Sequence, residues 1–188
     1  INDYLSKKLE GNTLKKKLIS LLSTLNVASK KGMEEQFDAT IGRTTVLAPY
    51  GGKYQLTKSQ SSVHKLPVNG ITNTVHIMTY GFNPYLSEKS PYHGSQYAVI
   101  ESLAKLVASG GNHHQARFTF QEYFERLGKD PLKWGKPFSA LIGAYKALSN
   151  FELAAIGGKD SMSGTYHDLH VPPTLVSFAI TTTSINQI

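Results

Sequence analysis

Ten residues, 155–164 with the sequence AIGGKDSMSG, gather glycines, serines, a lysine and an aspartate in one short stretch. Glycines let the backbone approach a ligand closely, and successive N–H groups in such a turn attract anions. Lys159 supplies a positive charge for a phosphate group, and Asp160 supplies an oxygen ligand for Mg²⁺. The stretch predicts a loop that binds a nucleotide phosphate and its metal ion; a Gly-rich surface turn is the alternative.

Other catalytic motifs do not fit this sequence. The stretch is not a Walker A loop, because Asp160 follows Lys159 and Leu153 stands where the first glycine belongs. His167, Asp168 and His170 lack the helical H-E-x-x-H spacing of a zinc protease. The sequence also lacks a G-x-S-x-G elbow and a Rossmann glycine motif that follows a strand. No catalytic residue is therefore predicted.

Composition narrows the class of protein. The 188 residues suffice for one domain with a substantial core, and the absence of cysteine excludes disulfides and thiolate sites. No apolar run approaches the length of a membrane span and no export signal is visible, so we expect a cytoplasmic protein. Because the chain starts at Ile1 and ends on a strand-like run, we expect a fragment of a longer protein.

The net charge of +7 raises the alternative of a basic nucleic-acid-binding module. Much of the excess sits in short lysine clusters, which favours a solvated helix face. Only three arginines are present, fewer than we expect of a strong nucleic-acid reader.

Hydrophobic periodicity predicts an α+β or α/β fold, with a mixed sheet and helices packed on one face. The expected helices are 13–25, 91–109 and one that Pro137 opens; the expected strands are 44–47, 61–68, 71–80, 117–123 and 174–181. Asn69-Gly70 predicts a two-residue hairpin turn. The helix after Pro137 should turn one apolar face to the core: Phe138, Leu141, Ile142, Tyr145 and Leu148.

Two pairs of side chains admit both a structural and a metal-binding interpretation. Glu101 and Lys105 are one helical turn apart, so they form either a surface ion pair or a site in which Glu101 reaches a metal. His64 and His76 lie on the expected hairpin, where exposed strand histidines are favoured over a metal pair.

Several long motifs carry a resemblance to a known family. They are 157–163 (GGKDSMS), 171–179 (VPPTLVSFA), 118–124 (FTFQEYF), 134–138 (WGKPF) and 80–87 (YGFNPYLS). Together they closely resemble the second synthetase half of the large phosphoribosylformylglycinamidine synthases, and the resemblance runs from about Val27 to Ala179.

The resemblance implies a ligase of purine biosynthesis that uses ATP and glutamine to convert formylglycinamide ribonucleotide to formylglycinamidine ribonucleotide. It implies partners as well: the other synthetase half and a glutaminase domain. Its fold would be like the N-terminal domain of aminoimidazole ribonucleotide synthetase, whose sheet pairs with a partner domain into a barrel. Residues 1–32 would then be a helical lead-in, 33–170 the domain itself, and 171–188 the first strand of a following domain.

This sequence departs from the pattern of the catalytic half in that family. The segment 79–84 has no histidine where the catalytic one is expected, so the resemblance is to the half that holds a structural nucleotide. There Gly157, Gly158, Lys159, Ser161 and Ser163 would bind ATP or ADP, and Asp160 and Glu101 would hold Mg²⁺.

The metal site of that half is also altered. Lys105 replaces an expected asparagine ligand and cannot ligate a cation, and Asn69 or Gly70 stands where an aspartate is expected. The isolated chain is expected to be inactive and to form a homodimer, and a purely structural dimerisation domain is a further alternative.

Overall fold

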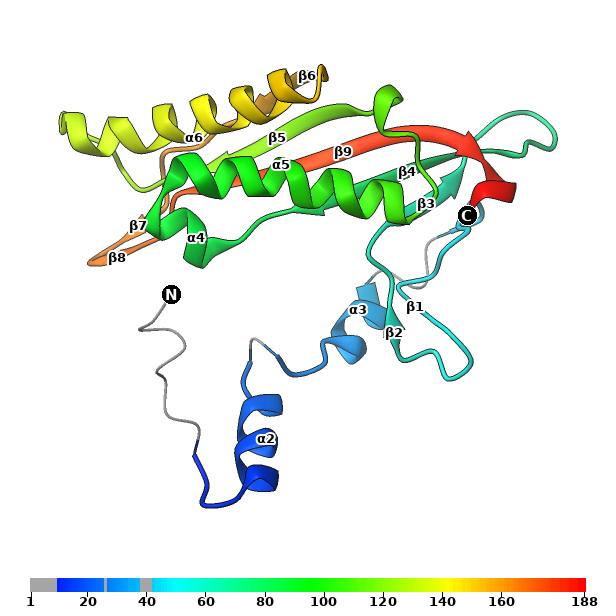
Figure 1. Cartoon of the computed structure of the whole chain (residues 1–188), viewed down its shortest axis with the longest axis horizontal. Coiled ribbons are helices and arrows are strands. Elements are labelled where there is room, and N and C mark those ends of the chain that lie inside the picture. The colour runs from blue at the N-terminus through cyan, green and yellow to red at the C-terminus, as the bar shows by residue number, and fades with distance from the viewer. Residues whose placement is uncertain (1–9, 26, 38–41) are drawn as a thin grey trace. The chain divides into compact units, whose positions relative to one another are not determined.

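The computed structural model describes residues 10–25, 27–37 and 42–188. The chain forms two compact units, residues 1–40 and 41–188. The first unit contains helices α2 (Leu14–Leu22) and α3 (Lys31–Phe37) (Figure 1). The second holds every described strand and the remaining helices.

Helix α2 confirms the start of the first expected helix. The side-chain oxygen of Thr13 accepts a hydrogen bond from the Lys16 N–H, as an N-cap does. The helix ends at Leu22 rather than Leu25, and none of its residues is buried. The expected loop at 37–42 falls largely on residues 38–41, which lie outside the described residues.

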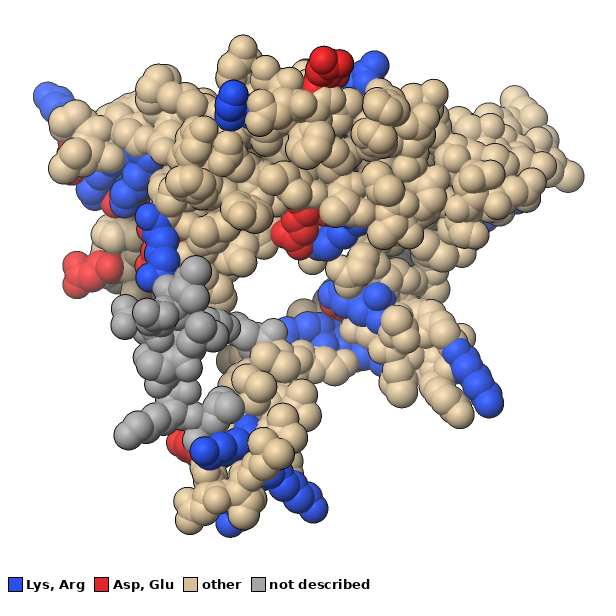
Figure 2. Space-filling view, viewed as in Figure 1, with Lys and Arg blue, Asp and Glu red and all other residues tan. Residues whose placement is uncertain are grey.

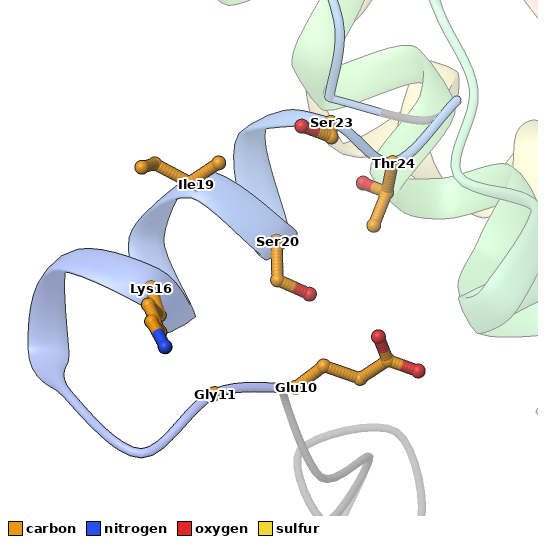
Figure 3. Close-up of a pocket in the computed structure, with 7 residues that line it drawn as sticks. All are labelled: Glu10, Gly11, Lys16, Ile19, Ser20, Ser23 and Thr24. Carbon is orange, nitrogen blue, oxygen red and sulfur yellow. The ribbon is translucent and has the colours of Figure 1, made fainter.

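An open hollow beside α2 follows from one tight turn (Figure 3). Gly11 has a φ of +124°, and a Cβ there would meet the Cβ of Lys16 at 2.5 Å. The lining residues are Glu10, Gly11, Lys16, Ile19, Ser20, Ser23 and Thr24. The glycine thus lets the chain fold back along the helix.

The second unit is built on a five-stranded mixed sheet in the order β3-β4-β9-β5-β6. Only β5 and β6 run parallel; the other neighbours are antiparallel. The strands are β3 (Ser62–Lys65), β4 (Thr74–Gly81), β5 (Arg117–Tyr123), β6 (Ala154–Lys159) and β9 (Thr174–Ser184). Two small ribbons, β1 (Tyr50–Gly51) with β2 (Thr57–Lys58) and β7 (Thr165–Tyr166) with β8 (Leu169–His170), complete the strands.

Strand β9 is the central strand of this sheet. It pairs with β4 on one side and β5 on the other, with Phe178 opposite both Tyr80 and Thr119. Within the segment 171–188, which we expected to open a following domain, residues 174–184 form this central strand. The sequence pattern identified a strand and could not identify its neighbours.

The hairpin β3–β4 forms as expected, with a longer connection. His64 lies opposite His76, and Val75 and Ile77 are fully buried while Met78 is exposed, which confirms the predicted alternation. Residues 66–73 connect the strands instead of a two-residue turn at Asn69-Gly70. The strand expected at 44–47 is reduced to a single bridge between Thr45 and His64.

Helices α5 (Pro91–Ala108) and α6 (Pro131–Asn150) cover one face of the sheet (Figure 1). Ser90 caps α5 and Pro91 follows at its first position, as predicted. Short helices α4 (Pro84–Lys89) and η1 (His113–Gln115) lie in connections, and η2 (Ile185–Gln187) follows β9. Helix α6 begins at Pro131 rather than Pro137, because Asp130 caps it and Pro131 occupies its first turn.

The face of α6 that we expected in the core is mostly exposed, and Leu148 is the one residue of the five that is buried. Phe138 and Tyr145 are 65% and 71% exposed, whereas Ala140, Ala144 and Ala147 are buried. Small residues let α5 and α6 approach closely, and a Cβ on Gly143 would meet the Tyr92 carbonyl oxygen at 2.1 Å. Close packing of the two helices therefore outweighs burial of the larger apolar side chains on α6.

Two glycines of α6 provide a matched test of this packing. Gly143→Ala should lower the free energy of unfolding by about 2 kcal/mol, because the new methyl has no space. Gly135→Ala should raise it by about 0.5 kcal/mol, since nothing lies within 4 Å of a Cβ there and alanine favours helix. Urea unfolding of both variants measures the difference, and equal effects would contradict the close contact.

Candidate functional site

The first half of the glycine-rich stretch is an edge strand, and this corrects the loop we expected there, whereas residues 160–164 form no strand. Residues Ala154–Lys159 form β6, parallel to β5. The register shifts between Phe118 and Thr119, where Ile156 bulges out and Gly157 adopts a φ of +146°. Only a glycine takes that backbone conformation without strain, so the bulge accounts for one glycine of the motif.

Gly158 has a different role, which is close contact with the neighbouring strand. A Cβ at this position would lie 2.8 Å from the carbonyl oxygen of Phe120. An open hollow of about 500 Å³ lies at this edge of the sheet. Its lining residues are Thr119, Phe120, Gln121, Ile156, Gly157, Gly158, Lys159 and Phe178.

The segment after β6 is fastened to the end of β5. The Ser161 N–H donates to the Glu122 carbonyl (3.1 Å), and the Phe124 N–H donates to the Ser161 carbonyl (2.9 Å). The Ser161 and Ser163 hydroxyls are 2.9 Å apart, and the Lys159 ammonium donates to the Asp160 carbonyl (3.0 Å). The structure therefore holds all the predicted residues from 157 to 163 next to one another, although Asp160, Ser161 and Ser163 do not line the hollow.

Glu101 lies elsewhere. Its carboxylate pairs with the Lys105 ammonium at 2.6 Å and accepts a hydrogen bond from the Phe82 N–H at 3.1 Å. In the register, Gly81 and Gly158 are three strand spacings apart, roughly 14 Å. Because a Cβ on Gly81 would touch Glu101, Glu101 belongs to the β4 side of the sheet and is not brought to Asp160.

The ion-pair interpretation of Glu101 and Lys105 is thus the one the structure shows. The Lys105 ammonium also donates to the Tyr80 carbonyl (3.0 Å) and lies 4.6 Å from the centre of the Tyr80 ring. Within the described part of the chain, no group of three or more His, Asp or Glu side chains is placed to hold a metal ion.

Glu122 is a residue of this region that the sequence patterns missed. It is 7% exposed, and burial, followed by the charge of Asp160, raises the pKa of its carboxyl to about 7. In a strand of alternating polar and apolar residues, the sequence pattern predicts that a glutamate is exposed to solvent. The alternation in β5 alone therefore does not reveal its burial.

Glu125 is also buried, but it is fully compensated. Its carboxylate accepts from the Lys133 ammonium at 2.8 Å and from the Lys136 ammonium, both on α6. His170 of β8 lies 3.9 Å away. These lysine hydrogen bonds lower the pKa of Glu125 to about 2, so the group ties the start of α6 to the segment that follows β5.

This ion cluster should make stability depend on acid pH. A carboxyl whose pKa falls from 4.5 to about 2 on folding stabilises the fold above pH 4.5, and that contribution disappears as the pH falls towards 2. Glu125→Gln should cost about 1–2 kcal/mol at pH 7, less than the full shift because the lysines are partly exposed. Near pH 2 the variant and the parent chain should unfold alike. Urea unfolding at the two pH values measures this, and an undiminished difference at low pH would contradict the assignment.

No protein-family model matches the sequence, but individual relatives do. The PurL subunit of phosphoribosylformylglycinamidine synthase from Picrophilus torridus is 29% identical over 56% of this chain and 14% of its own length. The PurL subunit from Thermoplasma volcanium is 22% identical over 83% of this chain and 20% of its own length. The chain is a relative of PurL.

The fold agrees with that relationship. The structure of Thermotoga maritima PurL complexed with ATP covers 85% of this chain and 24% of its own, with a TM-score of 0.62 at 20% identity. The mixed sheet with helices on one face is thus confirmed as a PurL-like fold. The chain spans a fifth or less of the length of these curated PurL relatives. No described helix is long and apolar enough to cross a membrane.

Proposed function

We propose that this chain is a non-catalytic synthetase domain of a phosphoribosylformylglycinamidine synthase, which holds ADP or ATP at the edge of its sheet. The full enzyme would be the ligase of purine biosynthesis described by the resemblance, in the cytoplasm, with the other synthetase half and a glutaminase as partners. The observation that carries the proposal is the β6 edge. There, Gly157, Gly158 and Lys159 line an open hollow in a chain related to a protein solved with ATP.

The chemistry of the β6 edge suits a nucleotide. An edge strand keeps one row of backbone N–H and C=O groups free for a ligand. Lys159 adds an ammonium group for phosphate oxygens, and Phe178 offers an aromatic face in the same hollow. Ser161 and Ser163 supply hydroxyl donors next to it.

The segment 79–84 supports a non-catalytic role. Gly81 is pressed against α5, where a Cβ would meet the Ala98 carbonyl oxygen at 2.2 Å. The Asn83 side chain accepts from the Leu86 N–H at 3.1 Å and so caps α4. Thus Gly81 and Asn83 serve the fold, and the segment has no histidine to transfer a proton.

The outer face of the sheet supports pairing with a partner domain. On β9, residues alternate between fully buried ones and partly exposed ones such as Val176, Phe178 and Ile180. Met78 of β4 lies opposite Ile180 and is 38% exposed. An apolar surface on the face without helices suits a second sheet, and a second copy of this chain would take its place when the partner is missing.

The nucleic-acid alternative has less support. On the face of the 41–188 unit shown in Figure 2, the described Lys and Arg side chains lie in small groups separated by uncharged surface. Lys133 and Lys136 share an ion pair with Glu125, and Lys105 pairs with Glu101. A phosphate backbone is read best by a continuous basic stripe.

Calorimetric titration with ADP and Mg²⁺ tests the nucleotide site. Lys159→Ala should weaken binding about tenfold, because one charge-assisted contact to phosphate is lost. Lys146→Ala removes an exposed lysine of α6 and should leave the affinity unchanged. Absence of binding to the parent chain would refute the site.

Light scattering across a concentration series tests the pairing surface. The parent chain should approach a dimer, and Ile180→Glu should shift it to a monomer, because a carboxylate cannot be buried unpaired between two sheets. Tyr145→Glu places the same charge on the exposed face of α6 and should still dimerise. If Tyr145→Glu dissociated the dimer instead, the interface would lie on the helices.

A further inference from the structure

Two histidines face each other across the β3–β4 hairpin. His64 of β3 lies directly opposite His76 of β4 in the antiparallel register. Their rings are nearly parallel, with an angle of 21° between the ring planes and 5.6 Å between the ring centres. Both side chains are half-buried, whereas Val63 and Val75 next to them in the chain are fully buried. Because neighbours in a strand point to opposite faces, the two imidazoles stand side by side on the face of the sheet without helices.

The spacing of the two rings suits one shared metal ion. Zn²⁺ binds histidine nitrogen at about 2.0–2.1 Å, which puts the ring centres of two histidines on one tetrahedral ion roughly 5 Å apart. The observed 5.6 Å is close to this separation. Facing positions on antiparallel strands keep their Cβ atoms about 4.5–5.5 Å apart, so rotation of the side chains alone would turn one nitrogen of each ring to a common ion.

A hydroxyl beside His64 supports this use of the ring. The Thr45 hydroxyl lies 3.5 Å from Nδ1 of His64, and the bridge between Thr45 and His64 holds the two residues together. An oxygen that accepts from one ring nitrogen fixes the orientation of the imidazole and leaves the other nitrogen for a metal. Burial, followed by the charge of His64, lowers the pKa of His76 below its usual 6.5, so this ring is neutral and offers a lone pair at pH 7.

We propose that His64 and His76 together bind one divalent transition-metal ion of the Zn²⁺, Ni²⁺ and Cu²⁺ class. Imidazole suits these ions, whereas Mg²⁺ prefers oxygen ligands. Water or an anion from solution fills the remaining coordination positions. The sequence pattern favoured two exposed strand histidines, and the facing rings favour the metal pair instead. Since β3 is a four-residue edge strand, an ion held by both histidines fastens this strand to β4.

This metal site is separate from both surfaces of the proposed function. Strands β3 and β6 are at opposite edges of the sheet, so the histidines are far from the hollow at Lys159. On β9, the partly exposed apolar residues end at Ile180, and Thr182 is the residue opposite His76. The pair therefore lies beside the apolar surface proposed for pairing.

Calorimetric titration of Ni²⁺ into the whole 188-residue chain tests the site. His64→Gln and His76→Gln should each weaken Ni²⁺ binding roughly tenfold or more, because each leaves a single imidazole ligand. His167→Gln is the matched control: it removes a histidine of the 167–170 turn, which is not placed to form a metal cluster, and should bind within about twofold of the parent chain. No Ni²⁺ binding by the parent, equal binding by His64→Gln, or loss of binding in His167→Gln would overturn the assignment.

A measurement without any variant guards against a substitution that disturbs the hairpin itself. In amide NMR spectra of the parent chain, substoichiometric Cu²⁺ should broaden the signals of His64, His76 and Thr182, because a paramagnetic ion acts on the nuclei nearest to it. The signals of His167 and His170 should stay sharp. Broadening at the second group alone, or no local broadening, would refute the site.

Discussion

The position of β9 between β4 and β5 is the constraint on which the rest of the structure depends. It joins a hairpin from the first half of the unit to a β-α-β segment from the second half. Ser177, in the middle of this strand, also shares a hydrogen bond with Ser102 of α5 at 2.9 Å. Strand β9 therefore determines both the strand order of the sheet and the position at which α5 packs on it.

The site inherits its geometry from that strand. Antiparallel pairing with β9 fixes β5, and β5 in turn positions β6 and the turn at Ser161. Because β6 has a neighbour on one side only, its free edge is the place where a ligand can meet backbone groups. Gly157 is required because its φ is positive, and Gly158 because a Cβ there would collide with β5. The two glycines are thus explained by the fold, whereas Lys159 and the hydroxyls of Ser161 and Ser163 could still contact a ligand.

Sequence patterns predicted the parts of this protein that depend on local physics. The Ser90-Pro91 cap, the alternation in β4 and the final strand are set by a few neighbouring residues, and all three are observed. Long motifs resembling phosphoribosylformylglycinamidine synthases also led to the fold. The failures concern partners distant in sequence: which strands flank β9, which face of α6 meets α5, and that residues 154–159 pair with β5. A pattern of large apolar residues could not find a helix contact made by Ala140, Gly143 and Ala144.

For the candidate site as well, the sequence predicted what is local and missed contacts between residues that are distant in sequence. The residues 157–163 are contiguous in sequence, so their proximity was certain in advance, whereas joining Asp160 to Glu101 required a distance across the sheet. The structure places Glu101 against a lysine and leaves Glu122 with a neighbour of like charge. Two glutamates three residues apart, Glu122 and Glu125, are both buried, yet α6 supplies lysines only to the second. The two lysine ammonium groups lower the pKa of Glu125 to about 2, whereas burial and the charge of Asp160 raise the pKa of Glu122 to about 7. The spacing of the two acids in the sequence could not reveal this difference, because it depends on which of them the lysines of α6 reach in the folded chain.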